Sequence, residues 1–240
     1  MSSADLEVLA YEPSPIGMIC LRRRPLPSNP DRIVTEITVD HEFLMSSGVT
    51  DSERALARMG LDQVEGSDLR VLVGGLGLGY TAREALRSGR VAHVEVVELL
   101  AQVIGWLEQD LIPLAGELKA DARLSVVEGD VFGRLAGPAG PAEESDAGRF
   151  DLILVDVDHS PDEPLGASSA AFYEPDGLVR AMRHLRPGGV LGVWSYQESE
   201  RLAQAFGVVS RDSRVEPVTF FDAVVQAEAV NWLYFGRRND

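Results

Sequence analysis

The chain has 240 residues, of which 45% are hydrophobic and 25% are charged, so it is long enough and apolar enough to bury a sizeable core. Its formal net charge is −16 at pH 7. A surface this acidic repels phosphate backbones and anionic lipid headgroups, which argues against nucleic acid and membrane partners.

The first 67 residues predict a small β region followed by a linking helix. Three β-type runs, LEVLAYE, GMICLRRR and RIVTEITVD, are separated by turn-forming segments, as in a hairpin or meander. The basic run Arg22–Arg24 is interpreted as a solvated strand end rather than a binding patch. The segment TDSERALARMGL then predicts a helix capped by Thr50 or Asp51, with Glu53 in its first turn to oppose the helix dipole.

The single cysteine, Cys20, and the character of the N-terminus favour a cytoplasmic protein. One cysteine cannot form an internal disulfide, and no Cys/His cluster has zinc spacing, so we expect a reducing compartment and no metal site. The opening MSSADLEVLA lacks a basic segment followed by an apolar one. No apolar run reaches the roughly 18 residues that a membrane span needs.

From residue 68 onward the pattern changes to alternating strands and helices, which is typical of a doubly wound α/β sheet. Strands such as DLILVD and GVLGVW are apolar almost throughout, as strands covered by helices on both faces must be. The segments RVEPVTFFDAVV and AVNWLYFGRR predict an antiparallel pair at one sheet edge, since no helix separates them. We therefore expect a mostly parallel, Rossmann-like domain over residues 68–240, after an N-terminal unit over 1–67. The expected strands are 70–74, 93–98, 123–127, 150–156 and 189–195, and the expected helices are 80–88, 99–114, 172–185 and 198–206.

A glycine-rich turn, within VLVGGLGLGYTAREAL, joins the first of these strands to its helix. Gly75, Gly77 and Gly79 can adopt backbone angles closed to other residues and let a ligand approach the main chain, although a tight turn without a ligand has the same pattern. No G-K-[ST] follows, which excludes a P-loop, and the dinucleotide fingerprint fails at Tyr80. A nucleoside such as S-adenosylmethionine is the best remaining candidate.

Two further features at the carboxyl ends of strands favour a nucleoside. Glu98, followed by Leu99, ends the second strand, where its carboxylate can accept hydrogen bonds from both ribose hydroxyls or can instead cap the next helix. Asp130 ends the third strand and can accept the adenine amine, while Val131 offers its backbone N–H to the ring. Three such features in this order predict adenosine binding.

Six segments carry a resemblance to a known family. They are VLVGGLGLGYTAREAL, VEVVELL, VVEGDVF, FDLILVDVDHSPDEP, AFYEPDGLVRAMRHLRPGGVLGVW and ITVDHEFLMSS. Over roughly residues 33–236 the chain resembles the spermidine synthases, polyamine aminopropyltransferases built on the class I methyltransferase fold. The resemblance implies S-adenosylmethionine or its decarboxylated form as co-substrate, a small-molecule acceptor such as a polyamine, and a homodimer.

The resemblance also implies a role for Asp156, which ends the central strand in DLILVDVDHSPD. In the family the corresponding aspartate accepts a proton from the attacking amine or orients it, and alkyl transfer from a sulfonium needs that lone pair to be free. Asp158 and His159 follow, and they can act as a second base or acceptor contact, or they can only fix the loop. Two carboxylates without a third ligand make a Mg²⁺ site the less favoured reading.

The acceptor half departs from the family pattern. The family's glycine loop usually reads G-G-G-D-G-G, with the aspartate contacting the aminopropyl end of the donor, whereas this chain has Leu76 and Leu78 and no acid. VTDSERAL replaces the family's D-E-F-x-Y. Four residues are candidates for the acceptor side, or alternatively for the core or wall: Ser46, Ser47, Tyr173 and Trp194.

The sequence therefore predicts a spermidine-synthase-like transferase that moves an aminopropyl or other alkyl group to a nucleophile near Asp156. An S-adenosylmethionine-dependent small-molecule methyltransferase is the first alternative, because the loop lacks its acid. A non-catalytic nucleoside-binding protein is the second. A nicotinamide oxidoreductase is disfavoured by the break at Tyr80.

Overall fold

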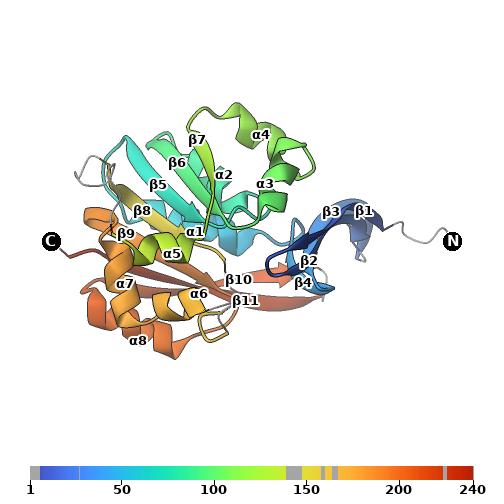
Figure 1. The fold of residues 1–240 in the computed structure, drawn as a ribbon. Coiled ribbons are helices and arrows are strands. Elements are labelled where there is room, and N and C mark those ends of the chain that lie inside the picture. The colour runs from blue at the N-terminus through green and yellow to red at the C-terminus, as the bar shows by residue number, and fades with distance from the viewer. Residues whose placement is uncertain are drawn as a thin grey trace.

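The chain folds into two separate sheets, seen in a computed structural model that describes residues 6–26, 28–138, 148–157, 160–163, 167–223 and 226–239 (Figure 1). One sheet has four strands in the order β1-β2-β3-β4, and the other has seven in the order β10-β11-β9-β8-β5-β6-β7. The α/β fold class predicted from the sequence is confirmed.

The N-terminal sheet is an antiparallel meander of β1 (Glu7–Ser14), β2 (Gly17–Leu26), β3 (Asn29–Val39) and β4 (Glu42–Ser46). The sequence predicted its first three strands but not β4. The chain reverses into β4 through Asp40 and His41, whose φ angles of 49° and 74° are both left-handed. This is the backbone of a two-residue hairpin turn that usually carries Asn-Gly or Asp-Gly, so its sequence signal is weak here.

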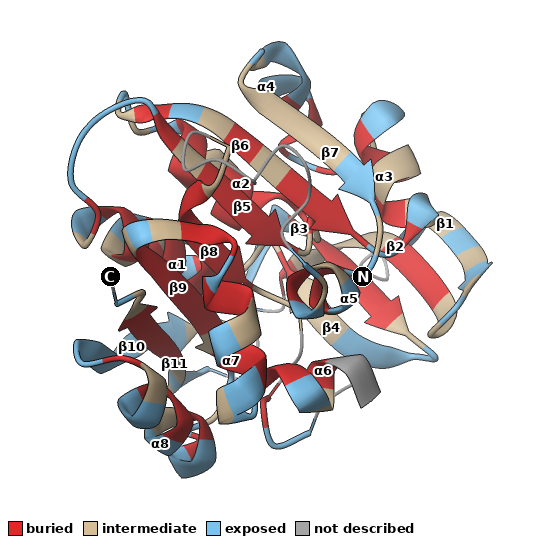
Figure 2. Cartoon of the chain, turned by 60° about the vertical axis from the view of Figure 1, so that its left-hand side comes forward, coloured by how far each residue is buried: buried red, intermediate tan, exposed pale blue. Residues whose placement is uncertain are grey.

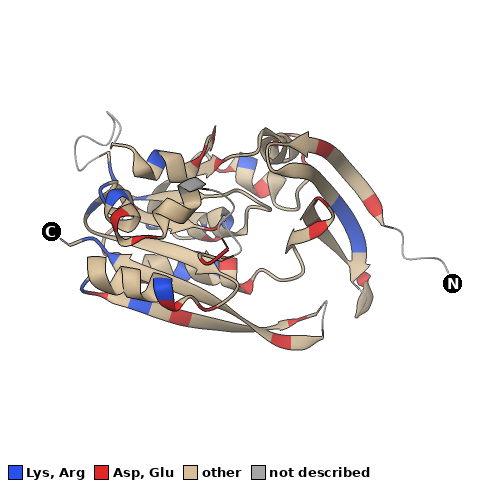
Figure 3. Ribbon diagram, turned by 60° about the horizontal axis from the view of Figure 1, so that its bottom comes forward, with Lys and Arg blue, Asp and Glu red and all other residues tan. Residues whose placement is uncertain are grey.

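The basic run of β2 is paired rather than solvated. The side chain of Glu36 on β3 is fully buried, and its carboxylate forms ion pairs with Arg22 (2.9 Å) and Arg24 (2.6 Å). Figure 3 shows the run as a continuous blue segment of the N-terminal sheet. Because a buried carboxylate needs opposite charge, Arg22 and Arg24 stabilise the sheet instead of forming a free patch.

The main sheet has five parallel strands and an antiparallel pair at one edge. The parallel strands are β5 (Leu69–Gly74), β6 (Val91–Glu98), β7 (Leu124–Glu128), β8 (Phe150–Val155) and β9 (Leu185–Ser195). The pair is β10 (Ser213–Asp222) with β11 (Ala227–Arg237), and β11 joins the sheet antiparallel to β9. This is the predicted terminal pair. Figure 2 shows β5, β8 and β9 buried over most of their length.

Helices cover both faces of this sheet, and each face has its own core. Alternate residues of β8 point to opposite sides: Leu152 and Leu154 join one cluster, and Ile153 and Val155 join the other. The first cluster packs under α1 (Asp51–Asp62), α2 (Tyr80–Leu86), α3 (Ala101–Glu108) and α4 (Ala115–Ala120). The second packs under α5 (Val131–Ala136), α6 (Ala167–Phe172), α7 (Pro175–Met182) and α8 (Glu200–Val209).

Two predicted helices are shorter than expected. The helix expected over 99–114 ends at Glu108 as α3, before the left-handed Asp110 (φ 60°), and α4 begins only at Ala115. Of the helix expected over 172–185, residues 175–182 form α7, and α6 ends at Phe172. Pro175 occupies the first turn of α7, where its missing N–H costs nothing, so a new helix starts there.

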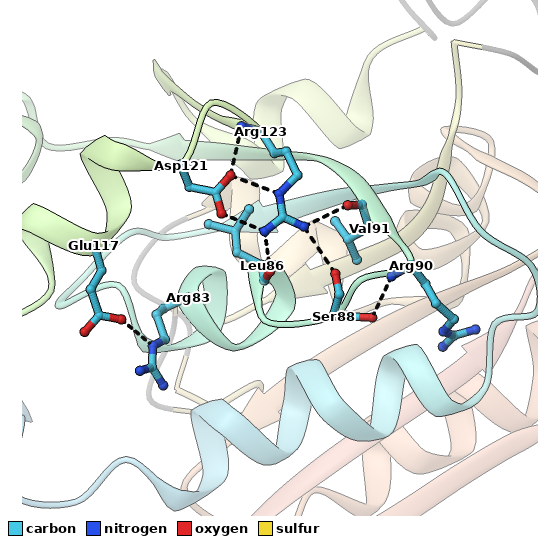
Figure 4. A network of polar contacts seen from close by, with 8 residues as sticks. All are labelled: Arg83, Leu86, Ser88, Arg90, Val91, Glu117, Asp121 and Arg123. Carbon is cyan, nitrogen blue, oxygen red and sulfur yellow. Dashed lines mark hydrogen bonds and ion pairs between the residues drawn. The ribbon is translucent and has the colours of Figure 1, made fainter.

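Arg123, just before β7, ties the outer strands to α2 (Figure 4). Its guanidinium donates to the backbone oxygens of Leu86, Ser88 and Val91, and it forms an ion pair with Asp121. The hydrogen bonds from Arg123 hold the pKa of Asp121 below its usual value. The amino-terminal edge of the sheet is thus cross-linked by one cation.

The N-terminal sheet packs on the α3 side of the main sheet. The Trp106 indole Nε1 donates to Glu12 Oε1 (3.0 Å), and Gln102 Nε2 donates to the carbonyl of Pro13 (2.6 Å). Ile19, Leu21 and Ile37 share a core cluster with α1 and β5. Within the described ranges, the helices are too short or too polar to cross a lipid bilayer.

Candidate active site at the carboxyl edge of the sheet

The glycine turn is confined by its own protein neighbours. Gly75, Gly77 and Gly79 have left-handed φ angles of 90°, 50° and 87°. A Cβ at Gly75 would lie 2.4 Å from the backbone oxygen of Asp156, and one at Gly77 would lie 2.6 Å from Met45 Sδ. One at Gly79 would lie 2.4 Å from Leu118 Cδ1. The left-handed backbone, and at Gly75 the main chain of Asp156, therefore favour glycine here whether or not a ligand approaches.

The intervening leucines turn into the core. Leu76 and Leu78 are 5% and 0% exposed and belong to the cluster beneath α1 to α4. The turn therefore presents main chain and no acidic side chain toward the edge of the sheet.

Glu98, at the end of β6, faces the glycine turn. Its Oε2 accepts from the N–H of Leu76 (2.7 Å), and its Oε1 accepts from the N–H of Leu100 (2.8 Å). Burial raises the pKa of Glu98, whereas these backbone hydrogen bonds lower it. The carboxylate thus braces the turn and the start of α3, and a carboxylate has further lone pairs for ribose hydroxyls. The neighbouring Leu99 is 45% exposed.

Asp130 and Val131 lie at the same edge. Glu98 pairs with Glu128 across β6 and β7, so Asp130 follows just beyond the paired ends. Its Oδ1 accepts from the N–H of Phe132 (2.9 Å), which makes it the cap of α5, and its side chain is exposed to solvent. The Val131 side chain is buried and would contact a Cβ at Gly74.

Asp156 lies directly after β8, between the glycine turn and α2. Its backbone N–H donates to the carbonyl of Gly74 (3.0 Å), and Thr81 Oγ1 donates to its Oδ2 (2.6 Å). Burial of the carboxyl raises the pKa of Asp156 to about 6, against the Thr81 hydrogen bond, which lowers it. Asp156 is therefore mostly ionised at neutral pH and remains a usable base. Asp158 and His159 lie outside the described residues.

A second buried acid, Glu53, approaches Asp156 from α1. Glu53 is 9% exposed, its Oε2 accepts from Ser52 Oγ (3.1 Å), and its backbone oxygen lies 3.5 Å from Thr81 Oγ1. Burial, and then the charge of Asp156, raise the pKa of Glu53 to about 8.

Sequence reasoning assigned Glu53 only to the helix dipole. The signal that could have revealed it is helical spacing, because Glu53 shares a face with the buried Leu56, Ala57 and Gly60 at i+3, i+4 and i+7.

The four acceptor-side candidates occupy different places. Trp194 shares the Asp156 side of the sheet, since β8 and β9 pair at Val155 and Val193 and alternate residues share a face. Its indole Nε1 is buried without a hydrogen-bond partner in the described part of the chain. Tyr173 is 1% exposed and belongs to the cluster on the opposite face, beside Phe132.

Ser46 and Ser47 stabilise the turn after β4. Ser46 Oγ accepts from the N–H of Gly48 (3.1 Å), and Ser47 Oγ accepts from the N–H of Thr35 (2.8 Å). A hydrogen bond with Ser47 also counteracts the burial that raises the pKa of Tyr80, the first residue of α2. Ser47 therefore contacts the start of α2.

Two other features lie apart from this edge. A hollow of about 350 Å³ is found at the amino-terminal end of β9, opposite Asp156; its lining is Gly188, Arg211, Arg237, Arg238 and Asn239. Among the described residues, no group of three or more His, Cys, Asp or Glu side chains is placed to hold a metal ion.

Comparison with known sequences finds relatives over about half of the chain. No family model matches. A polyamine aminopropyltransferase of Prochlorococcus marinus is 33% identical over 126 residues, which cover 52% of this chain and 40% of that protein. Putrescine N-methyltransferase 3 of Nicotiana tabacum is 29% identical over 124 residues, covering 51% of this chain and 29% of that protein. The chain therefore spans less than half the length of these curated relatives.

Solved structures are similar over nearly the whole chain. A spermidine synthase in complex with the transition-state analogue AdoDATO has a TM-score of 0.74 at 17% identity, covering 97% of this chain and 74% of that one. The Thermotoga maritima spermidine synthase has a TM-score of 0.72 at 16% identity, covering 97% and 73%. The resemblance seen in the sequence is confirmed: the chain is similar to polyamine aminopropyltransferases, and it has the fold of the spermidine synthases.

Proposed function

We propose that this chain is a transferase of the spermidine synthase kind, which moves an aminopropyl or other alkyl group from a sulfonium nucleoside to an amine. The observation that carries the proposal is the Asp156 carboxylate, held by Thr81 at the carboxyl edge of the sheet, beside the glycine turn. The names of the relatives, polyamine aminopropyltransferase and putrescine N-methyltransferase, support an amine acceptor.

The proposed reaction is an in-line displacement at carbon. The amine nitrogen forms a new N–C bond, the C–S bond of the sulfonium breaks, and its electron pair leaves with the neutral thioether. Asp156 accepts the proton of the incoming ammonium, which frees the lone pair, and holds the nitrogen in line. A pKa of about 6 suits this step, because the group is ionised at neutral pH and can still take up a proton.

The proposed donor site uses the rest of the edge. Glu98 accepts hydrogen bonds from the ribose hydroxyls through its remaining lone pairs, and Asp130 accepts one from the adenine amine. The ligand approaches the main chain of the glycine turn most closely. Both named activities of the relatives fit such a site. Methyl transfer from S-adenosylmethionine is the second candidate, and the burial of Leu76 and Leu78 favours it, since the turn has no acid for a cationic aminopropyl group.

A donor-exchange assay tests the proposal. The protein is incubated with putrescine and either S-adenosylmethionine or its decarboxylated form, and mass spectrometry identifies the by-product. Methylthioadenosine indicates aminopropyl transfer, and S-adenosylhomocysteine indicates methyl transfer. Tighter calorimetric binding of NAD than of either donor contradicts the proposal, as does the absence of any transfer to amines.

The variant Asp156→Asn tests whether Asp156 is the general base. We expect a turnover loss of about 100- to 10,000-fold, the usual contribution of a general base, with donor affinity largely unchanged. Asp62→Asn, at the exposed far end of α1, is the control and should keep full turnover. Equal turnover of Asp156→Asn and the unmodified protein would remove Asp156 from the mechanism.

We also propose a homodimer, as the resemblance implies, and, from the acidic charge and the single cysteine, a cytoplasmic protein without a nucleic acid or membrane partner. Sedimentation of the purified protein measures the oligomeric state directly.

A further inference from the structure

Thr81 contacts two acidic residues that come from separate elements, the carboxylate of Asp156 and the backbone of Glu53. Asp156 follows β8, Glu53 lies in the first turn of α1, and Thr81 lies in the first turn of α2. The Thr81 hydroxyl donates to Asp156 Oδ2 at 2.6 Å and lies 3.5 Å from the backbone oxygen of Glu53. The packing of α1 on α2 therefore holds two carboxyl groups within electrostatic reach of each other.

No cation balances this pair within the described residues, where the ion pairs include neither acid. Asp51 adds a further negative charge from the same helix turn, and Tyr80 at the start of α2 is neutral. The guanidinium of Arg54, the residue after Glu53, lies over the Tyr80 ring at 5.3 Å. The strands packed against α1 present apolar side chains to it, among them Leu152, Leu154, Trp194, Leu233 and Phe235.

Two acids placed in this way cannot both ionise at neutral pH unless a cation or further hydrogen-bond donors stabilise the second charge. To replace the water that its carboxylate would lose, Glu53 has its own backbone N–H and the hydroxyl of Ser52. Asp156 has the stronger donor and ionises first, after which its charge opposes ionisation of Glu53. With its pKa raised to about 8, Glu53 retains its proton at pH 7.

We propose that Glu53 is a positioning residue that exchanges its proton for the charge of the acceptor: it stays protonated beside Asp156 in the free protein and releases that proton when an alkylammonium binds. The O–H bond of Glu53 breaks, the proton passes to solvent, and the new carboxylate is balanced by the ammonium. This inference rests on the proposed function, because it requires a cationic amine at Asp156. It assigns acceptor recognition to α1 as well as to the end of β8.

Proton-linked binding of putrescine tests the inference. The dissociation constant is measured by calorimetry from about pH 6.5 to about pH 8.5, in buffers of different ionisation heat. If one proton is released, the unmodified protein should bind about tenfold more tightly for each unit of pH up to about 8 and then level off. Glu53→Gln should bind without this slope and without proton release.

Three further variants complete the experiment. Glu53→Asp keeps a carboxyl group and should retain proton release. Asp156→Asn removes the charge that holds the proton, so the slope should move to lower pH. Glu65→Gln changes an exposed acid beyond the end of α1 and should behave as the unmodified protein does. A thermal melt of each variant confirms that it is folded.

The outcomes separate the two proposals. An equal slope in Glu53→Gln and the unmodified protein overturns the role of Glu53, and amine transfer that depends on Asp156 would still stand. If the unmodified protein neither binds putrescine nor transfers a group to any amine, the proposed function fails and the inference fails with it.

Discussion

Glu98 and Glu53, two acids at the same sheet edge, are buried to similar extents but receive different hydrogen bonds from the protein. Glu98 is 6% exposed and Glu53 is 9% exposed, and burial raises the pKa of both. Four backbone N–H groups lower the pKa of Glu98, whereas the pKa of Glu53 is lowered by its own backbone N–H and the Ser52 hydroxyl and is raised further by the charge of Asp156. Backbone hydrogen bonds therefore oppose the effect of burial at Glu98, whereas burial and a like charge act together at Glu53, which stays neutral at pH 7.

The neutrality of Glu53 has a consequence for stability. The unfolded chain loses the Glu53 proton near the ordinary value of 4.5, whereas the folded chain keeps it to about pH 8. Between these values the folded state binds more protons, so its stability falls as pH rises, by about 1.4 kcal/mol per pH unit for this one group. Above pH 8 both states are ionised and the penalty stops growing.

We therefore expect Glu53→Gln to gain stability relative to the unmodified protein as pH rises from about 5 to about 8, and the difference to stay constant above that. Urea denaturation at a series of pH values measures it. Glu65→Gln provides the exposed control and should show no such trend. Parallel stability curves for Glu53→Gln and the unmodified protein would mean that Glu53 is ionised in the folded state.

At the scale of elements, the glycine turn depends on the N-terminal sheet. Met45, on β4, places its sulfur where a Cβ of Gly77 would be, at 2.6 Å. The turn is thus packed against a strand from the other sheet.

The variant Gly77→Ala tests this packing. Its methyl group must meet Met45 and accept a left-handed φ of 50°, so we expect a loss of about 1–3 kcal/mol in the free energy of unfolding. Gly89→Ala is the control, since nothing lies within 4 Å of the Cβ it would add. Adding Met45→Ala should recover the part of the loss that comes from the contact. Equal stability of the two glycine variants would show that the turn tolerates a side chain at position 77.

Element by element, the sequence predicted strands better than helix ends. Buried parallel strands such as β8 carry an unmistakable apolar run, and the terminal pair was recognisable because no helix intervenes. The break between α3 and α4 depends on a left-handed Asp110, which few sequence signals mark. Strand β4 was missed for the same reason, because Asp40 and His41 form an atypical turn.

At the scale of the whole molecule, the two sheets share one core. Trp106 is fully buried on α3, and its indole N–H reaches Glu12 of β1 at 3.0 Å. The cluster that contains Trp106 also contains Ile19 and Ile37 from the N-terminal sheet. Shared burial of this kind couples the sheets energetically.

We expect the two sheets to unfold together. Transitions followed by far-UV circular dichroism and by tryptophan fluorescence in urea should coincide. Glu12→Ala leaves the buried indole N–H unpaired and should lower the stability by about 1–3 kcal/mol without splitting the transition. A separate early transition, seen by circular dichroism alone, would show that the N-terminal sheet unfolds independently.

The geometry of the site was only partly readable from the sequence. Glu98 and Asp130 end neighbouring parallel strands, so topology alone brings them to one edge. The meeting of Glu53 with Asp156 depends on how α1 packs across the sheet, and no local pattern encodes that contact. Tyr173 was a candidate for the acceptor side or for the core, and it lies in the core on the other face, where it packs against Phe132.

The contact between Met45 and Gly77 bears on how this protein can be re-engineered. A chimera that grafts the N-terminal sheet of one homologue onto the seven-stranded sheet of another would exchange Met45 without its glycine partner, and a larger side chain there would collide with the turn. The two positions form one unit of design and should be transplanted together.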